Sequence, residues 1–217
     1  MSELHQEKHP FVDFVKKNQK ALTYTLTAIV VVVLAYFGYT ELYQNPREVK
    51  AADSMYTAEK YFGLDSSNYV LNGDGTNKGV LYIIKEYSGT QAANLAKYYA
   101  GISYYRMNDY NKSIEYLKDF STSARQVQAI AYGTIGDAYS DLKKNDEAIE
   151  YYKKAGGHFP EDEGISAEYL FRAASLLEMT GKADDAIEIY KTIKSKYPKT
   201  DKGFQADKYI NRLKVQP

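Results

Sequence analysis

The sequence predicts an all-α protein in which a single N-terminal transmembrane helix is followed by an α-solenoid of helical hairpins. Three observations predict this fold. Residues 21–40 contain no charged side chain. Further along the chain, one pattern of small and aromatic residues occurs three times. In the remaining segments, apolar residues recur at the three- and four-residue spacing of one helix face. A repeat period of roughly 20 to 50 residues is typical of helical arrays, whose units bury their apolar faces against one another.

The composition is that of a folded protein, and it excludes several classes of function. The 217 residues carry 28 basic and 28 acidic side chains, and 44% of them are hydrophobic. Nucleic-acid binding needs clustered basic residues, so no nucleic-acid partner is expected. Because the chain has no cysteine, it has no disulfide, thiolate metal site, thiol nucleophile or lipoprotein anchor. The 23 tyrosines are expected mainly as large rings packed between helices.

The first expected element is a membrane-spanning helix at residues 21–43. Its uncharged part runs from Ala21 to Thr40. At about 1.5 Å per residue, twenty residues are long enough to cross a hydrocarbon core of about 30 Å. A cleaved signal peptide would have a shorter apolar region and an A-x-A-like site, and the candidate Ala35-Tyr36-Phe37 lacks the second small residue. A buried core helix also fits less well, because the apolar run is too long. We therefore expect a retained anchor that places residues 21–43 in the lipid bilayer.

Basic residues close to the span predict its orientation. They are Lys16, Lys17 and Lys20 on the N-terminal side, whereas the first basic residue after the span is Arg47. The positive-inside rule therefore places residues 1–20 in the cytoplasm and residues 44–217 outside, which in a bacterium is the periplasm. The expected location is the bacterial inner membrane, with a single pass. Residues 10–17 are expected either as a short amphipathic helix at the inner surface or as a disordered tail.

Residues 46–88 are expected to form an atypical first helical hairpin, as is common for the end repeat of a solenoid. Pro46 suits the first turn of its first helix, because proline has no backbone N–H to lose there. Residues 72–79 form a turn-rich loop between the two helices. A calcium-loop reading of this segment fails, since Asn77 stands where glycine is required and Ile83 stands where the bidentate glutamate is required.

The most regular repeat lies between Tyr132 and Pro160. It reads Tyr132-x2-Ile135-Gly136-x2-Tyr139, then Ala148-x3-Tyr152, Ala155 and Pro160, and it resembles the tetratricopeptide repeat (TPR). The pattern returns 35 residues upstream and 38 residues downstream. The three TPRs are expected at residues 94–127, 129–162 and 167–200. The second helix of the first repeat is expected from Asn111 to about Ser123, and a capping helix at residues 201–214.

The sequence offers little to support catalysis. Its only histidines are His5, His9 and His158, and no pair of them on the expected array has a metal-ligand spacing. Glycine-rich phosphate loops and zinc-protease motifs are absent from the sequence. Asp137 and Asp141 share one helix face, which an exposed polar stripe explains. No enzymatic activity, cofactor, metal site or catalytic residue is expected.

The TPR resemblance implies a concave protein-binding groove lined by the first helix of each repeat. The corresponding residues are Leu95, Tyr98, Ile102, Tyr105 and Arg106 in the first repeat, Asp137 and Asp141 in the second, and Phe171 and Glu178 in the third. TPR domains that clamp a C-terminal carboxylate have Lys and Asn at groove positions where this chain has Tyr98 and Ile102, so that ligand class is disfavoured. The alternative for Tyr98 and Ile102 is packing against neighbouring helices.

The whole layout resembles the YfgM-type family of ancillary subunits of the bacterial Sec translocon. Besides the anchor and the array, two runs carry the resemblance, Asp65 to Gly75 and Asn94 to Gly101, which look like members from Bacteroidota-type bacteria. The resemblance implies that the chain lies beside the SecYEG channel, associates with a PpiD-like periplasmic chaperone and assists exported client polypeptides by binding, without chemistry. The alternative function is a periplasmic scaffold or adaptor for envelope assembly or a secretion machine.

Overall fold

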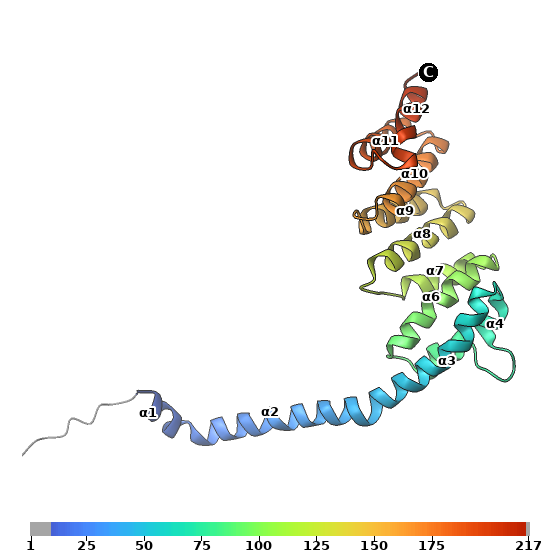
Figure 1. The fold of residues 1–217 in the computed structure, drawn as a ribbon. Coiled ribbons are helices and arrows are strands. Elements are labelled where there is room, and N and C mark those ends of the chain that lie inside the picture. Colours follow the sequence, from blue (N-terminus) through green and yellow to red (C-terminus); the bar gives the residue numbers. More distant parts are fainter. Residues whose placement is uncertain (1–9, 216–217) are drawn as a thin grey trace, which may run out of the picture. The chain divides into compact units, whose positions relative to one another are not determined.

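A computed structural model describes residues 10–215, and within this range the chain is helical apart from its turns and one isolated β-bridge between Gly73 and Lys78 (Figure 1). The chain divides between Val49 and Lys50 into two compact units, which are described separately below. The helical elements are α1 (Pro10–Lys17), α2 (Gln19–Tyr39), the π-helical turn η1 (Thr40–Gln44), α3 (Asn45–Gly63), α4 (Ser67–Asn72), α5 (Val80–Glu86), α6 (Gln91–Arg106), α7 (Tyr110–Lys118), α8 (Arg125–Asp141), α9 (Asn145–His158), α10 (Glu163–Met179), α11 (Ala183–Lys196) and α12 (Asp201–Val215).

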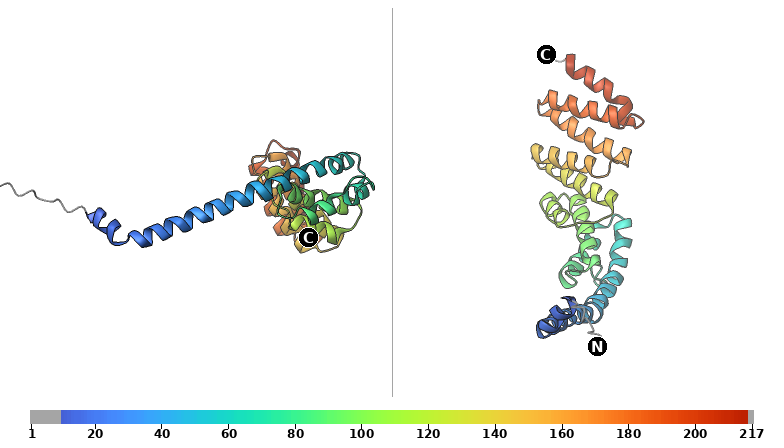
Figure 2. Two further views of the ribbon diagram at one scale, coloured as in Figure 1. Left: turned by 90° about the horizontal axis from the view of Figure 1, so that it is seen from below. Right: turned by 90° about the vertical axis from the view of Figure 1, so that its left-hand side faces the viewer.

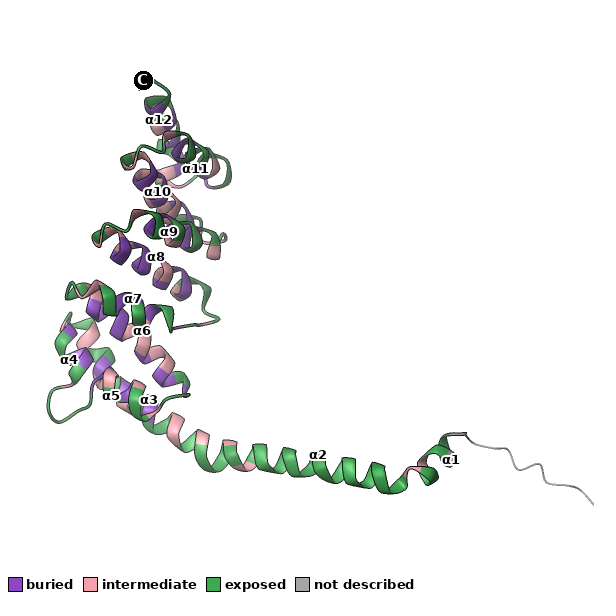
Figure 3. Ribbon diagram, turned by 180° about the vertical axis from the view of Figure 1, so that it is seen from behind, coloured by how far each residue is buried: buried purple, intermediate pink, exposed green. Residues whose placement is uncertain are grey.

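A helix that is long and apolar enough to cross a membrane begins in the N-terminal unit. From Gln19 to Gly63 the chain is helical without a break, and the most apolar window of this helix contains no buried residue. Figure 3 shows α2 exposed along almost its whole length, with Gly38 near its end half-buried. Of the two alternatives for residues 10–17, the structure has the helical one, α1. The part of the expected tail at residues 1–9, with His5 and His9, lies outside the described residues.

The expectation that a new helix begins at Pro46 is wrong. Instead, α2 continues through η1 into α3, with Pro46 at the second residue of α3. In η1 the backbone N–H of Asn45 donates to the carbonyl oxygen of Thr40, five residues earlier. Proline disrupts an α-helix because it cannot donate to the residue four earlier and its ring crowds that carbonyl. The wider π-turn just before Pro46 accommodates both effects, so the helix does not end.

The expected hairpin at residues 46–88 is also wrong, because the segment forms three helices, α3, α4 and α5. The additional helix, α4, places Val70 and Leu71 in a buried cluster together with Met55 of α3 and Ala96 of α6. Both α4 residues are almost completely shielded from solvent. A two-helix reading missed α4 because it is only 6 residues long, too short for a helical period to be recognised in the sequence.

The loop after α4 is organised by the side chain of Asp74. Its Oδ1 accepts hydrogen bonds from the backbone N–H groups of Thr76 (2.9 Å) and Asn77 (2.7 Å), and its Oδ2 accepts from the hydroxyl of Tyr61 (2.8 Å). Backbone and side-chain hydrogen bonds from Asn77 hold the pKa of Asp74 well below its usual range. The carboxylate thus accepts its hydrogen bonds from the loop itself and from α3, as in an Asx-turn.

Helices α6 to α12 stack in chain order within the second unit, and each contacts the helix before and after it (Figure 2). They pair as α6–α7, α8–α9 and α10–α11, and α12 packs on α11. Thr90, Asp109 and Asp162 cap the N-termini of α6, α7 and α10, because each side-chain oxygen accepts a hydrogen bond from a backbone N–H in the first turn.

Helix α7 ends at Lys118, whereas the sequence predicted an end near Ser123. Two side chains keep the segment that follows α7 in a non-helical conformation. The Asn94 Nδ2 donates to the Ser121 carbonyl oxygen at 2.7 Å, and the backbone N–H of Thr122 donates to Oε1 of the buried Gln128 at 2.9 Å. These side-chain bonds replace the helical ones that residues 121 and 122 would otherwise make, so the helix stops earlier.

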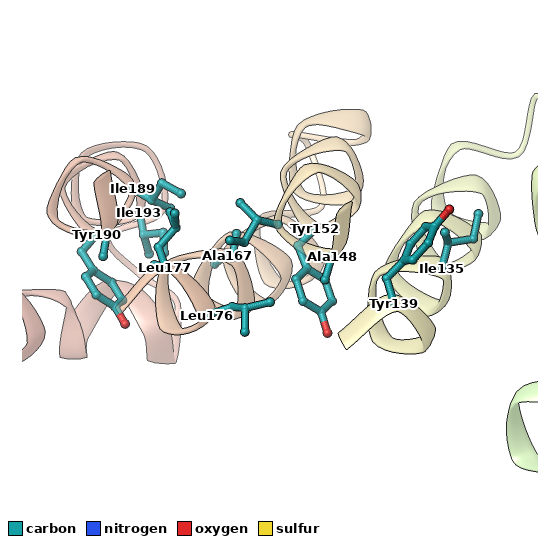
Figure 4. Packing of buried hydrophobic residues seen from close by; sticks show 14 of the residues in the cluster. Ile135, Tyr139, Ala148, Tyr152, Ala167, Leu176, Leu177, Ile189, Tyr190 and Ile193 are labelled. Atoms are coloured by element: carbon teal, nitrogen blue, oxygen red, sulfur yellow. The ribbon is translucent and has the colours of Figure 1, made fainter. Parts of the chain in front are cut away.

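The core of the array runs between the paired helices, and Figure 4 shows three of its rings, those of Tyr139 from α8, Tyr152 from α9 and Tyr190 from α11. In repeats one and two, a glycine of the first helix allows close approach: Gly101 contacts Leu117, and Gly136 lies against the ring of Tyr152. Tyr190, the equivalent residue in the third repeat, is completely buried. The small residues that the sequence analysis placed at these positions therefore have the expected packing role.

The first repeat contains two buried serines, and replacing one of them with alanine is expected to stabilise the protein. Ser103 and Ser113 are both 0% exposed, and their hydroxyls have no hydrogen-bond partner among the described residues. The position of Ser113 is taken by the equally buried Ala148 and Ala186 in the other repeats. An unpaired buried hydroxyl costs about 1–3 kcal/mol. We expect Ser113→Ala to raise the free energy of unfolding by about 1 kcal/mol.

The measurement is chemical denaturation of the full chain in detergent micelles, followed by circular dichroism. The exposed Ser195→Ala is the control, with an expected change within about 0.5 kcal/mol. A lower midpoint for Ser113→Ala would show that this hydroxyl does have a stabilising partner.

Candidate protein-binding groove

The residues nominated for the groove lie on the first helices of the three pairs, α6, α8 and α10. Arg106 and Asp141 are exposed. The half-buried ones are Leu95, Tyr98, Ile102, Tyr105, Asp137, Phe171 and Glu178. Several of them contact the neighbouring repeat: the Tyr105 hydroxyl donates to Asp141 Oδ2 at 3.2 Å, and Glu178 pairs with Arg212 of α12 at 2.6 Å. The structure therefore brings α6, α8, α10 and α12 together along one face.

Five of the nominated residues pack partly into the core. Leu95 lies against the buried cluster formed by α3 to α6, and the main cluster is contacted by Tyr98, Ile102, Tyr105 and Phe171. The ring of Tyr98 is 5.3 Å from that of Phe120, and burial raises the pKa of its hydroxyl. For Tyr98 and Ile102 the packing alternative is therefore the better description. An apolar side chain at the contact between two helices fills the space between them and is less available to a ligand.

Asp137 and Asp141 do not form an exposed polar stripe, in contrast to the sequence-based reading. Asp137 is half-buried and accepts hydrogen bonds from Tyr152 (2.8 Å) and from Arg172 (2.7 Å). Asp141 accepts a hydrogen bond from Tyr105 of the preceding repeat. The two carboxylates thus contact different neighbours, although a spacing of four residues places them on the same face of α8. Arg172 was missed because its partner is 35 residues away, beyond the reach of a local pattern.

Alternating charges continue from Asp137 across the third repeat. Arg172 binds Glu168 through Nε at 3.0 Å, and Lys202 of α12 approaches the other oxygen of Glu168 at 3.3 Å. Burial alone would lower the pKa of Arg172, but Asp137 and Glu168 outweigh that effect and raise it. Burial and the charge of Asp137 also raise the pKa of Tyr152. The carboxylates on this face are therefore paired with Arg172 and Lys202, which the sequence analysis did not select.

This part of the face contains a shallow depression of about 300 Å³. Met179, at its edge, is 81% exposed, and Phe171 provides an aromatic wall over which the ammonium of Lys202 lies at 4.2 Å. The lining residues are Ser140, Tyr152, Glu168, Phe171, Arg172, Ser175, Leu176, Met179 and Lys202. An apolar floor with charged and hydroxyl groups around it is suited to a protein segment that buries one apolar side chain and hydrogen-bonds its backbone.

The same network predicts a change in the pH dependence of stability. Burial alone would raise the pKa of Glu168, but Arg172 and Lys202 outweigh burial and lower it. The folded protein therefore binds this proton less readily than the unfolded chain. Its contribution to stability is complete above the unfolded pKa of about 4.3 and is lost as the pH falls through the lower folded pKa.

We expect Glu168→Gln to lose less stability than the wild type when the pH falls from about 5 to about 3, since the glutamine does not titrate. Lys202→Gln removes one of the two stabilising charges and should give an intermediate slope. Thermal melting across this pH range measures the slopes. Parallel curves for all three proteins would show that Glu168 is not coupled to folding.

The fold and this face define a class of protein, a helical-repeat array that binds other proteins. Models of the tetratricopeptide repeat match residues 95–123, 129–155 and 168–200, which correspond to the α6–α7, α8–α9 and α10–α11 pairs. The chain therefore contains tetratricopeptide repeats, and domains built from them generally bind protein partners. A search of curated proteins found no match to this sequence.

Proposed function

We propose that this chain is a membrane-anchored adaptor that binds partner proteins at the Sec translocon and assists exported polypeptides together with a periplasmic chaperone. It acts by binding, without catalysis. The observation that carries the proposal is the combination, in one chain, of a helix able to span a membrane and an array of protein-binding repeats. Anchoring would raise the effective concentration of the array for any partner in the same membrane. The location at SecYEG and the PpiD-like partner rest on the sequence resemblance.

The proposed orientation has a cytoplasmic N-terminus and a periplasmic array. A reporter that is active only in the periplasm, fused after Pro217, should be active, and a reporter active only in the cytoplasm should be silent. The opposite result would place the array in the cytoplasm and would remove the translocon exit as its site of action. The Lys16, Lys17 and Lys20 side chains are the expected determinants, so their replacement by glutamate should weaken the preference.

The partner is best identified by photo-crosslinking in intact cells. A crosslinking amino acid at Met179 lies at the edge of the depression, and the control position Tyr56 of α3 is similarly exposed, at 75%. We expect Met179 to capture translocon subunits, a periplasmic chaperone or exported precursors, with few products at Tyr56. Capture of envelope-assembly or secretion-machine subunits instead would favour the scaffold alternative. Products at Tyr56 alone would show that the groove is not the binding face.

A further inference from the structure

A second surface of the array carries three lysines on tyrosine rings. Lys118 of α7 donates a hydrogen bond of 2.7 Å to the hydroxyl of Tyr139, and its ammonium lies 5.2 Å from that ring. Lys154 of α9 lies 4.1 Å from the ring of Tyr132 and 5.6 Å from that of Tyr151. Lys144, the third lysine, lies 5.9 Å from the ring of Tyr139. We call these six residues the lysine–tyrosine cluster.

The cluster lies away from the candidate groove. Tyr132 and Tyr139 are seven residues apart on α8 and therefore share one face of the helix. Asp137, a groove residue on the same helix, is five positions from Tyr132, which at 100° per residue places it about 140° around the axis. A ligand bound at the cluster would thus leave the groove free. An inference about the cluster is independent of the proposed function of the groove.

Packing of the repeats does not require these rings. The third repeat has aliphatic residues, Leu170, Leu177 and Ile189, at the positions equivalent to Tyr132, Tyr139 and Tyr151. Leu177 and Ile189 are buried there, so the same helix pair closes without any tyrosine at these positions. The first repeat has Tyr104 and Tyr116 at the positions of Tyr139 and Tyr151, and Lys112 lies 5.0 Å from the ring of Tyr104, but Lys112 is paired with Asp109 at 3.1 Å. What distinguishes the middle of the array is therefore the group of lysines on tyrosine rings without such a carboxylate partner.

The cluster combines positive charge with hydrogen-bond donors. In the part of the chain that the structure describes, none of the three lysines has a carboxylate within 4.0 Å, although Glu115, Glu147 and Glu150 lie on the same helices. An ammonium group can only donate, so the Tyr139 oxygen accepts from Lys118 and the hydroxyl keeps its own hydrogen for another acceptor. Exposed ammonium groups next to such a hydroxyl are complementary to carboxylates.

We propose that the lysine–tyrosine cluster is a docking site for an acidic segment of a partner protein. Glutamate or aspartate side chains would take the positions next to Lys118, Lys144 and Lys154, and their flanking carbons would lie on the tyrosine rings. A membrane surface fits less well, because Tyr139 is 9% exposed and Tyr132 and Tyr151 are half-buried, so no ring projects far enough to insert. The balanced charge of the chain argues against a nucleic acid.

The test uses the full chain in neutral maltoside micelles with a fluorescein-labelled polyglutamate peptide as the probe, measured by fluorescence anisotropy. The peptide should bind more weakly as the ionic strength rises, since exposed charges are screened. The triple variant Lys118→Gln, Lys144→Gln, Lys154→Gln should lose about tenfold in affinity, as expected for three surface ion pairs. The control triple Lys196→Gln, Lys199→Gln, Lys208→Gln has the same change in net charge and should bind within about twofold of the wild type.

Two further variants separate the cluster from misfolding and from the groove. Replacing the three cluster lysines with arginine keeps the charge and should retain binding, and Phe171→Ala with Met179→Ala should leave it unchanged. Equal losses in the two glutamine triples would reduce the effect to overall charge and overturn the proposal. Failure of the wild-type chain to bind polyglutamate would also overturn the proposal. Tighter binding to nanodiscs of phosphatidylglycerol than to the peptide would overturn it as well and would assign the cluster to a membrane surface.

Discussion

Tyr190→Ala is expected to lower the free energy of unfolding of the array by about 3–5 kcal/mol, the range for truncating a buried aromatic ring. The ring is 0% exposed and lies parallel to that of Tyr209, at 5.1 Å, with Phe171 at 5.7 Å. It therefore joins α10, α11 and α12. Alanine would leave a cavity there that three helices cannot close together, because their backbones are held by other contacts.

Tyr190→Phe is the matched control, because it keeps the ring and removes only the hydroxyl. That hydroxyl lies 3.3 Å from the Ser175 hydroxyl and 3.5 Å from Glu178, so its loss should cost about 1 kcal/mol. Denaturant titration of the full chain in micelles gives both values. Equal losses for alanine and phenylalanine would mean that the hydroxyl, and not ring packing, stabilises this end of the array.

Two adjacent glycines of α9 should respond in opposite directions to the same substitution. A Cβ at Gly156 would lie 2.7 Å from Leu170 Cγ and 3.0 Å from the Ser166 carbonyl oxygen. Since that oxygen belongs to the backbone of α10, it cannot rotate away, and overpacking of this kind costs about 1–3 kcal/mol. A Cβ at Gly157 meets nothing within 4 Å. There alanine should stabilise the helix by about 0.5–1 kcal/mol.

The two variants should therefore differ by about 2–3 kcal/mol in unfolding free energy, although they have the same composition. Thermal or denaturant midpoints of the two variants, measured under the same conditions, are sufficient to compare their stabilities, since any error in the treatment of the unfolded state affects both equally. If Gly156→Ala is as stable as the wild type, α9 and α10 are not held as closely as the structure indicates.

The array could be predicted from the sequence because its signals are local and repeated. Gly136, Tyr152 and Pro160 stand at fixed spacings, and a helix pair that buries such a pattern forms wherever it occurs. Elements that lie outside the repeats were harder to predict from the sequence. The short α4 has no recognisable period, and the helical continuation through Pro46 depends on η1, whose wider turn leaves no mark in the residue pattern.

The groove residues were only partly predictable for a different reason. Position in a repeat tells which face of a helix a residue occupies, and on that basis Phe171, Tyr105 and Asp137 were nominated for one face. The position in a repeat does not tell which residue of the next repeat lies opposite. Arg172, Lys202 and Arg212 pair across repeats, so they become visible only once the helices are packed.

These cross-repeat pairs give the array a fixed order. Asp141 of the second repeat matches Tyr105 of the first, and Asp137 matches Arg172 of the third. If the second repeat were lost by recombination, the third would meet the first with Met179 opposite Tyr105, and Arg172 would have no aspartate. The three repeats share a sequence pattern but are not interchangeable. Lengthening or shortening this protein by whole repeats would therefore require new partners at each junction.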